Sequence, residues 1–136
     1  FNGNVTIATT EVECDAAVAS IYSSLSRTGA VGFDTENIVF TDGSGLNSDK
    51  ASVVQICTGP KLCVIFPVHK WAWLYQSFAG LLNDGRVLKA AVGVAHDLAV
   101  LQNRFPSLSI QGTVDIPGYL KGRGHTFDSF SLQLLV

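Results

Sequence analysis

The chain contains no methionine and only three cysteines in 136 residues. An odd cysteine count without regular spacing excludes a disulfide framework, and no set of cysteines and histidines has the spacing of zinc ligands. No apolar run approaches the ~20 residues that a membrane-spanning helix needs. No positively charged segment followed by an apolar one marks a secretory signal. We therefore expect an intracellular protein, nuclear or cytoplasmic, that has no membrane partner.

Charge is also scarce. Charged residues make up 15% of the chain and the net charge is −2, which excludes the basic surface typical of bulk binding to nucleic acid. This low, slightly negative charge is still compatible with an enzyme that binds phosphates through metal ions, because the ions bring the positive charge. The hydrophobic content of 47% excludes disorder. We expect a single domain over residues 1–136 that is C-terminally incomplete, because the chain stops at Val136 within an apolar helical pattern.

The predicted elements alternate in the manner of an α/β fold. Thr10 and Glu13 form a capping-box pattern at the start of the first helix. A hairpin implies antiparallel strands and helical crossovers imply parallel ones, so we expect a mixed sheet with helices on both faces. The expected strands are at 4–8, 30–40, 51–57, 62–66, 87–92 and 113–116, and the expected helices at 10–29, 71–82, 96–105 and 129–136.

Cys57 and Cys63 flank the turn of the predicted hairpin, at residues 58–61. They either face each other across the hairpin or are buried, reduced thiols of an intracellular protein.

Asp34 and Glu36 stand one residue apart within an otherwise apolar strand. Side chains at i and i+2 of a strand point to the same face, so the two carboxylates are expected side by side. Two like charges held together on a half-buried surface are costly unless cations neutralise them. The pair indicates either a cation site or a strand end at which water solvates both acids.

A third acid, Asp97, follows the turn at Gly93, where a strand ends and a helix begins. Binding sites in α/β folds commonly form at such edges. An aspartate at this position can also cap the helix or complement its dipole. The adjacent His96 is either a simple exposed histidine or a contact to a metal-bound phosphate.

In order and spacing, these acids and the segments around them resemble the 3′–5′ exonuclease superfamily named for its four acids (DEDD). The resemblance is closest to its RNase D and Werner-type branch, on the ribonuclease H-like fold. It runs along nearly the whole chain and rests on the segments 31–36, 51–57, 81–94 and 126–132, and on Asp97 with Leu101.

The resemblance implies an enzyme that uses two divalent ions, Mg²⁺ or Mn²⁺, to hydrolyse nucleotides from the 3′ end of DNA or RNA. By family position, Asp34 would bridge both ions and Glu36 would hold the ion that activates water. Asp97 would bind the second ion, partly through water. The backbone near Thr35 and Glu36 would approach the terminal nucleotide.

The chain departs from the family pattern at its end. The family's last motif is a Tyr or His followed by a fourth Asp on a C-terminal helix, and the chain stops before it. Asp115 and Asp128 are the only later acids; the first is predicted on a strand and the second as a helix cap. His125 is either a substitute base or an exposed loop histidine.

Three hypotheses follow for the function. The first is an exonuclease core, weak or inactive as this piece alone, with protein partners available through the rest of the parent chain. The second is a catalytically inactive exonuclease-like module that binds nucleic acid or protein. The third is a small-molecule or structural α/β domain, in which every acid has its ordinary structural explanation.

Overall fold

The computed structural model describes residues 3–25, 29–37 and 50–122. Strands and helices follow the predicted order of types as far as the sixth strand. The elements are β1 (Asn4–Ile7), α1 (Glu11–Ser24), β2 (Ala30–Glu36), β3 (Val53–Cys57), β4 (Leu62–Phe66), the 3₁₀ turn η1 (Val68–Lys70), α2 (Gln76–Asn83), β5 (Leu88–Ala91), α3 (Val94–Arg104), β6 (Thr113–Asp115) and α4 (Ile116–Gly122).

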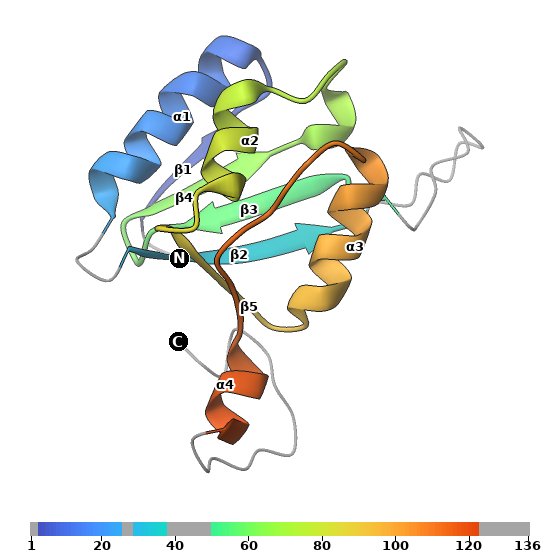
Figure 1. The fold of residues 1–136 in the computed structure, drawn as a ribbon. Helices are drawn as coiled ribbons and strands as arrows, with labels where there is room; N and C mark the ends of the chain where they lie inside the picture. The colour runs from blue at the N-terminus through green and yellow to red at the C-terminus, as the bar shows by residue number, and fades with distance from the viewer. Residues whose placement is uncertain (1–2, 26–28, 38–49, 123–136) are drawn as a thin grey trace.

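The strands form one six-stranded sheet in the order β1-β4-β3-β2-β5-β6. β2, β3 and β4 pair antiparallel, whereas β1 joins β4, and β5 joins β2 and β6, in parallel. α1 and α2 lie together over one face of this sheet, and α3 lies beside the C-terminal end of β2 (Figure 1). The predicted α/β fold with a mixed, helix-flanked sheet is confirmed.

Alternation along the central strands decides which side chains enter the core. In β2, Val31 and Phe33 are buried beneath the helices, and β3 buries Val54 and Ile56 in the same layer. Because successive side chains of a strand point to opposite faces, Asp34 is directed away from this core. Burial of the large apolar residues therefore fixes the face to which the acid points.

The opposite face of the sheet carries apolar side chains that are partly exposed. Val5 and Ile7 of β1 are 56% and 57% exposed. Near β6, Leu88 lines a shallow apolar pocket together with Ile116 and Tyr119 of α4. α4 thus approaches the face that α1 and α2 leave open.

Helix α1 begins as the sequence predicts. The Thr10 hydroxyl accepts a hydrogen bond from the Glu13 N–H at 3.2 Å, and the Glu13 carboxylate accepts one from the Thr10 N–H at 3.0 Å. This reciprocal capping box satisfies two N–H groups that the first helical turn would otherwise leave without partners.

The helix predicted over residues 71–82 is wrong in its first turn, because α2 begins only at Gln76. Trp71 and Tyr75 instead pack their rings 4.4 Å apart in a connecting segment. Trp71 also meets Phe78 edge-on at 5.0 Å. The burial of these aromatic rings against the core outweighs the local helical pattern.

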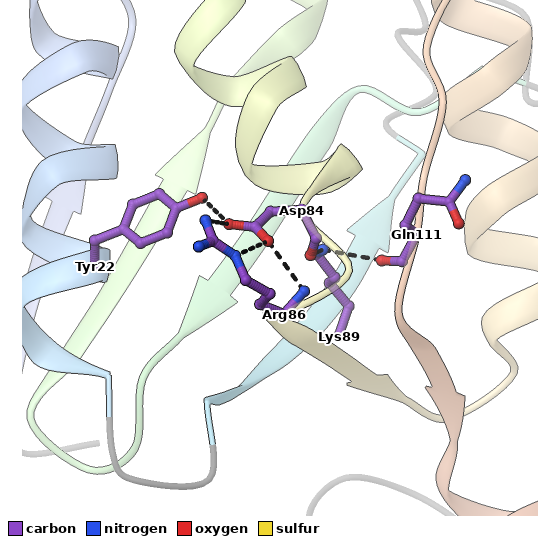
Figure 2. Close-up of polar contacts among 5 residues, drawn as sticks. All are labelled: Tyr22, Asp84, Arg86, Lys89 and Gln111. Carbon is purple, nitrogen blue, oxygen red and sulfur yellow. Dashed lines mark hydrogen bonds and ion pairs between the residues drawn. The ribbon is translucent and has the colours of Figure 1, made fainter.

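A polar cluster fastens the turn between α2 and β5 (Figure 2). The Tyr22 hydroxyl donates to the Asp84 carboxylate at 2.8 Å, and Arg86 Nε donates to the same carboxylate at 3.0 Å. Lys89 is fully buried, and its Nζ donates to the carbonyls of Asp84 at 2.7 Å and Gln111 at 2.9 Å. The cluster joins α1, the turn before β5 and the chain leading into β6.

The remaining differences between the predicted and observed elements concern where helices lie along the chain. α3 begins at Val94 rather than near His96, and α4 was not predicted. The predicted loop at 42–49 and the predicted helix at 129–136, with His125 and Asp128, lie outside the described residues. None of the described helices is long and apolar enough to span a membrane.

Candidate active site

Asp34 and Glu36 lie at the C-terminal end of β2 with their carboxyl groups within hydrogen-bonding reach of each other. Burial, and then the charge of Asp97, raise the pKa of Asp34. Burial, followed by the neighbouring charge of Asp34, raises the pKa of Glu36. The side-by-side placement predicted from their spacing is confirmed. Asp34 is partly buried, whereas Glu36 is exposed, so the alternative in which water solvates both acids holds for Glu36 and only in part for Asp34.

Asp97 lies in the first turn of α3 and is only 4% exposed. The hydroxyl of Thr35 donates a hydrogen bond to its Oδ1 at 2.5 Å, which joins residues 62 positions apart. Burial raises the pKa of Asp97, and the hydrogen bonds from Thr35 oppose that rise. The structure therefore brings Asp97 to the strand that carries Asp34 and Glu36.

The second oxygen of Asp97 has no partner within the part of the chain that the structure describes. Only Trp71 Nε1 shares this condition among the buried side-chain nitrogens and oxygens described. An unpartnered, buried carboxylate oxygen costs on the order of 1–3 kcal/mol or more. Such an atom calls for an explanation, and a bound cation is one that suits its negative charge.

The alternative role of Asp97 as a helix cap is wrong. Gly93 occupies the N-cap position with φ 72° and ψ 45°, a left-handed conformation that favours glycine. Glycine has no side chain that could accept hydrogen bonds from the N–H groups at the helix start. Asp115 of β6 provides this acceptor, because its Oδ1 accepts hydrogen bonds from the N–H groups of Gly93 at 3.0 Å and Val94 at 3.4 Å. Asp97 therefore does not cap α3, although it lies in the first helical turn, where its charge complements the helix dipole.

Asp115 is the residue that sequence reasoning underestimated. Its Oδ2 also accepts the N–H of Gly118 at 3.3 Å, so the side chain caps the start of α4 as well. An Asp followed closely by Pro117 is a local signal for that second cap. Its bond to Gly93 has no sequence signal, because 22 residues separate the two.

Two histidines are linked to the acids or to their backbone. His96 is exposed beside Asp97 in α3, where its charge lowers the pKa of that acid. His69 lies with its Nδ1 2.8 Å from the carbonyl oxygen of Ser52, whose own N–H donates to the carbonyl of Glu36. The role predicted for His96 in binding substrate stays a prediction.

The donor set suits a hard divalent cation, since carboxylate oxygens are the ligands that Mg²⁺ and Mn²⁺ prefer. Among the residues that the structure describes, no three Asp, Glu, His or Cys side chains converge as ligands of one ion. Beyond the effect of burial, all three acids are linked by charge, because Asp97 raises the pKa of Asp34, Asp34 raises that of Glu36, and Glu36 raises that of Asp97. Two ions that share one of these acids would each require only two of them from this part of the chain.

The chain is similar in sequence to known nucleases. Residues 9–136 match the sequence model of the 3′–5′ exonuclease family. A 3′–5′ exonuclease of Drosophila willistoni is 29% identical over 90 residues, which cover 63% of this chain and 25% of the relative. One from Drosophila ananassae is 30% identical over 66 residues, or 48% of this chain and 19% of the relative.

Solved structures of the EXD2 exonuclease domain have the same fold. The domain soaked in Mg and dGMP superposes with a TM-score of 0.74 at 26% identity, covering 89% of this chain and 60% of that one. The domain soaked in Mn gives 0.73 at 26% identity, with 88% and 58% covered. The chain thus spans a quarter or less of the curated relatives and about three-fifths of the solved domains.

Proposed function

The chain belongs to the 3′–5′ exonuclease family, and on that premise we propose that it forms the metal-binding core of an enzyme that hydrolyses nucleotides from nucleic-acid 3′ ends. The observation that carries this proposal is the placement of Asp97. A buried carboxylate with one unpartnered oxygen lies against the strand of two further acids that resist ionisation. Three mutually repelling acids are costly to keep together without cations.

The proposed roles follow the position of each acid. Asp34 would contact both ions, Glu36 would share one ion with it, and Asp97 would offer Oδ2 to the second. When bound, such a pair of ions activates water and stabilises the leaving oxygen. The charge of the ions would also attract the phosphates that the net negative chain does not.

Relatives support the choice of cation and substrate. The EXD2 exonuclease domain was soaked with Mg and with Mn, and with dGMP and with GMP. For this chain we propose Mg²⁺ or Mn²⁺ as the ions. The substrate would be DNA or RNA, with the backbone at Thr35 and the side chain of His96 near the terminal nucleotide.

A nuclease assay tests the proposal. The chain is incubated with Mn²⁺ and an oligonucleotide carrying its label at the 5′ end, so that removal of 3′ nucleotides gives a ladder. Asp34→Ala serves as the inactive control, and Asp15→Ala, on the exposed side of α1, as the matched surface control. For this chain by itself we expect at most a weak ladder, of equal strength for the wild type and Asp15→Ala and absent for Asp34→Ala. Equal cleavage by Asp34→Ala would refute the catalytic proposal.

A catalytically inactive module is the second candidate. It is favoured by the number of acids, because only three belong to the site in the described residues, and Asp115 is engaged in capping. This candidate predicts Mn²⁺ binding that depends on Asp34, with no cleavage in a longer chain that includes the family's last motif. Cleavage by the longer chain would exclude it.

A further inference from the structure

Cys57 and Cys63 lie directly opposite each other in the hairpin of β3 and β4. Their Sγ atoms are 2.7 Å apart, and the Cys57 thiol donates toward the Cys63 sulfur. Both side chains are partly exposed, whereas Cys14, the third cysteine of the chain, is buried. The first alternative for this pair, that the two face each other across the hairpin, is confirmed.

The register of the hairpin places this pair at a position suited to a covalent link. The Thr58 N–H donates to the Leu62 carbonyl at 3.1 Å, so Thr58 and Leu62 form a hydrogen-bonded pair. Pairs alternate along an antiparallel ladder, which makes the adjacent Cys57 and Cys63 a non-hydrogen-bonded pair with Cα atoms about 4.5 Å apart. Disulfides span Cα separations of about 4.4–6.8 Å, so the bond requires little backbone movement.

We propose that Cys57 and Cys63 are a redox modification site that closes reversibly to an intramolecular disulfide, with a small-molecule disulfide such as oxidised glutathione as the oxidant. The site is separate from the acids. Cys57 pairs with Gly32 on β2, whereas Asp34 pairs with Gln55, one pleat further along. The link therefore fixes the hairpin end of β3 and does not contact the acids.

The exchange proceeds in two balanced steps. The Cys63 thiolate attacks one sulfur of oxidised glutathione, forms a mixed disulfide and releases one glutathione thiolate. The Cys57 sulfur then loses its proton and attacks Cys63 Sγ, which closes the internal bond and releases the second glutathione. The two protons given up by the protein end on the two glutathiones, so one disulfide is reduced as one is formed.

The environment of Cys57 supports this order, because its thiol donates toward Cys63 Sγ and so holds its proton between the two sulfurs. Burial, and then the hydrogen bond to Cys63, raise the pKa of Cys57 to about 12. Cys57 therefore keeps its proton while the first attack takes place, because the thiolate is the nucleophile in such exchange.

The experiment counts thiols after exposure to excess oxidised glutathione and alkylation, by intact mass. We expect three alkylated thiols in the reduced chain and one in the oxidised chain, with peptide mapping locating the link at Cys57 and Cys63. Reduced glutathione in excess should restore all three. The Cys14→Ser variant should still form the link, which separates this site from the third cysteine.

Single variants test the order of attack. Cys57→Ser and Cys63→Ser cannot close the bond and should instead retain glutathione as a mixed disulfide. The adduct should form faster on Cys57→Ser, which keeps Cys63. The reverse ranking would overturn the assigned order. Three free thiols, or links only between two chains, would overturn the site itself.

Discussion

Replacing Thr35 by valine tests whether its hydroxyl holds Asp97 in place. Valine keeps the branched shape that suits β2 and removes only the hydroxyl. The 2.5 Å bond to Asp97 Oδ1 is then lost, although the backbone of Thr35 still contacts this carboxyl group. Hydrogen bonds to charged groups contribute about 1.5–3 kcal/mol. Asp97 is 4% exposed, so water cannot easily replace the bond.

We expect Thr35→Val to lower the free energy of unfolding by about 2 kcal/mol, measured by urea unfolding in the presence of a chelator. The Thr35→Ser variant keeps the hydroxyl and is the matched control. A double-mutant cycle with Asp97→Asn isolates the bond, because residues in contact show coupling of about 0.5–3 kcal/mol.

The same substitution should weaken Mn²⁺ binding by about tenfold in calorimetry, since ~1.4 kcal/mol of lost orientation corresponds to that factor. Thr35→Ser should bind Mn²⁺ nearly as the wild type does. If valine and serine variants agree in both stability and affinity, or if the cycle is additive, Thr35 does not position Asp97.

Three further perturbations address other parts of the molecule. Burial lowers the pKa of Lys89 from 10.5 to about 8. Between pH 8 and 10.5 the unfolded chain therefore binds this proton more than the folded chain does, and the free energy of unfolding should rise with pH. Urea unfolding at each pH should show a rise of up to ~3 kcal/mol for the wild type relative to Lys89→Met. Asp115→Ala should cost about 1–2 kcal/mol by removing the cap at Gly93, whereas Asp115→Asn, which keeps an acceptor oxygen, should cost less; equal losses would contradict the capping role. Asp34→Asn should raise the melting temperature in chelator, because it removes an acid whose pKa is raised. It should also abolish the gain in free energy of unfolding that Mn²⁺ gives the wild type, about 2.7 kcal/mol at 100 times Kd; an unchanged Mn²⁺ response would exclude Asp34 as a ligand.

Local patterns in the sequence predicted much of the fold correctly. The capping box at Thr10 and Glu13, the hairpin around residues 58–61 and the strand of Asp34 are all observed. Each depends on neighbours within a few residues, which interact in the same way wherever the segment lies in the fold.

Predictions failed where distant contacts decide the local structure. Residues 71–75 carry a helical pattern, yet the packing of Trp71 against Phe66 and Phe78 holds them outside α2. The role of Asp115 at the start of α3 was also missed, because Asp115 lies on another strand and accepts the N–H groups of Gly93 and Val94.

In the candidate site, too, local patterns predicted some features, and contacts between distant residues decided the others. By itself, the sequence determined that Asp34 and Glu36 share one face, since a strand's side chains alternate with period two. Only the tertiary structure decided that Asp97 lies against Thr35 with one oxygen unpartnered, and that Asp115 rather than Asp97 caps α3. The physical reason is that these contacts join residues 22 to 62 positions apart. Which of them meet is set by the order of the strands and by the packing of α3, not by any local periodicity.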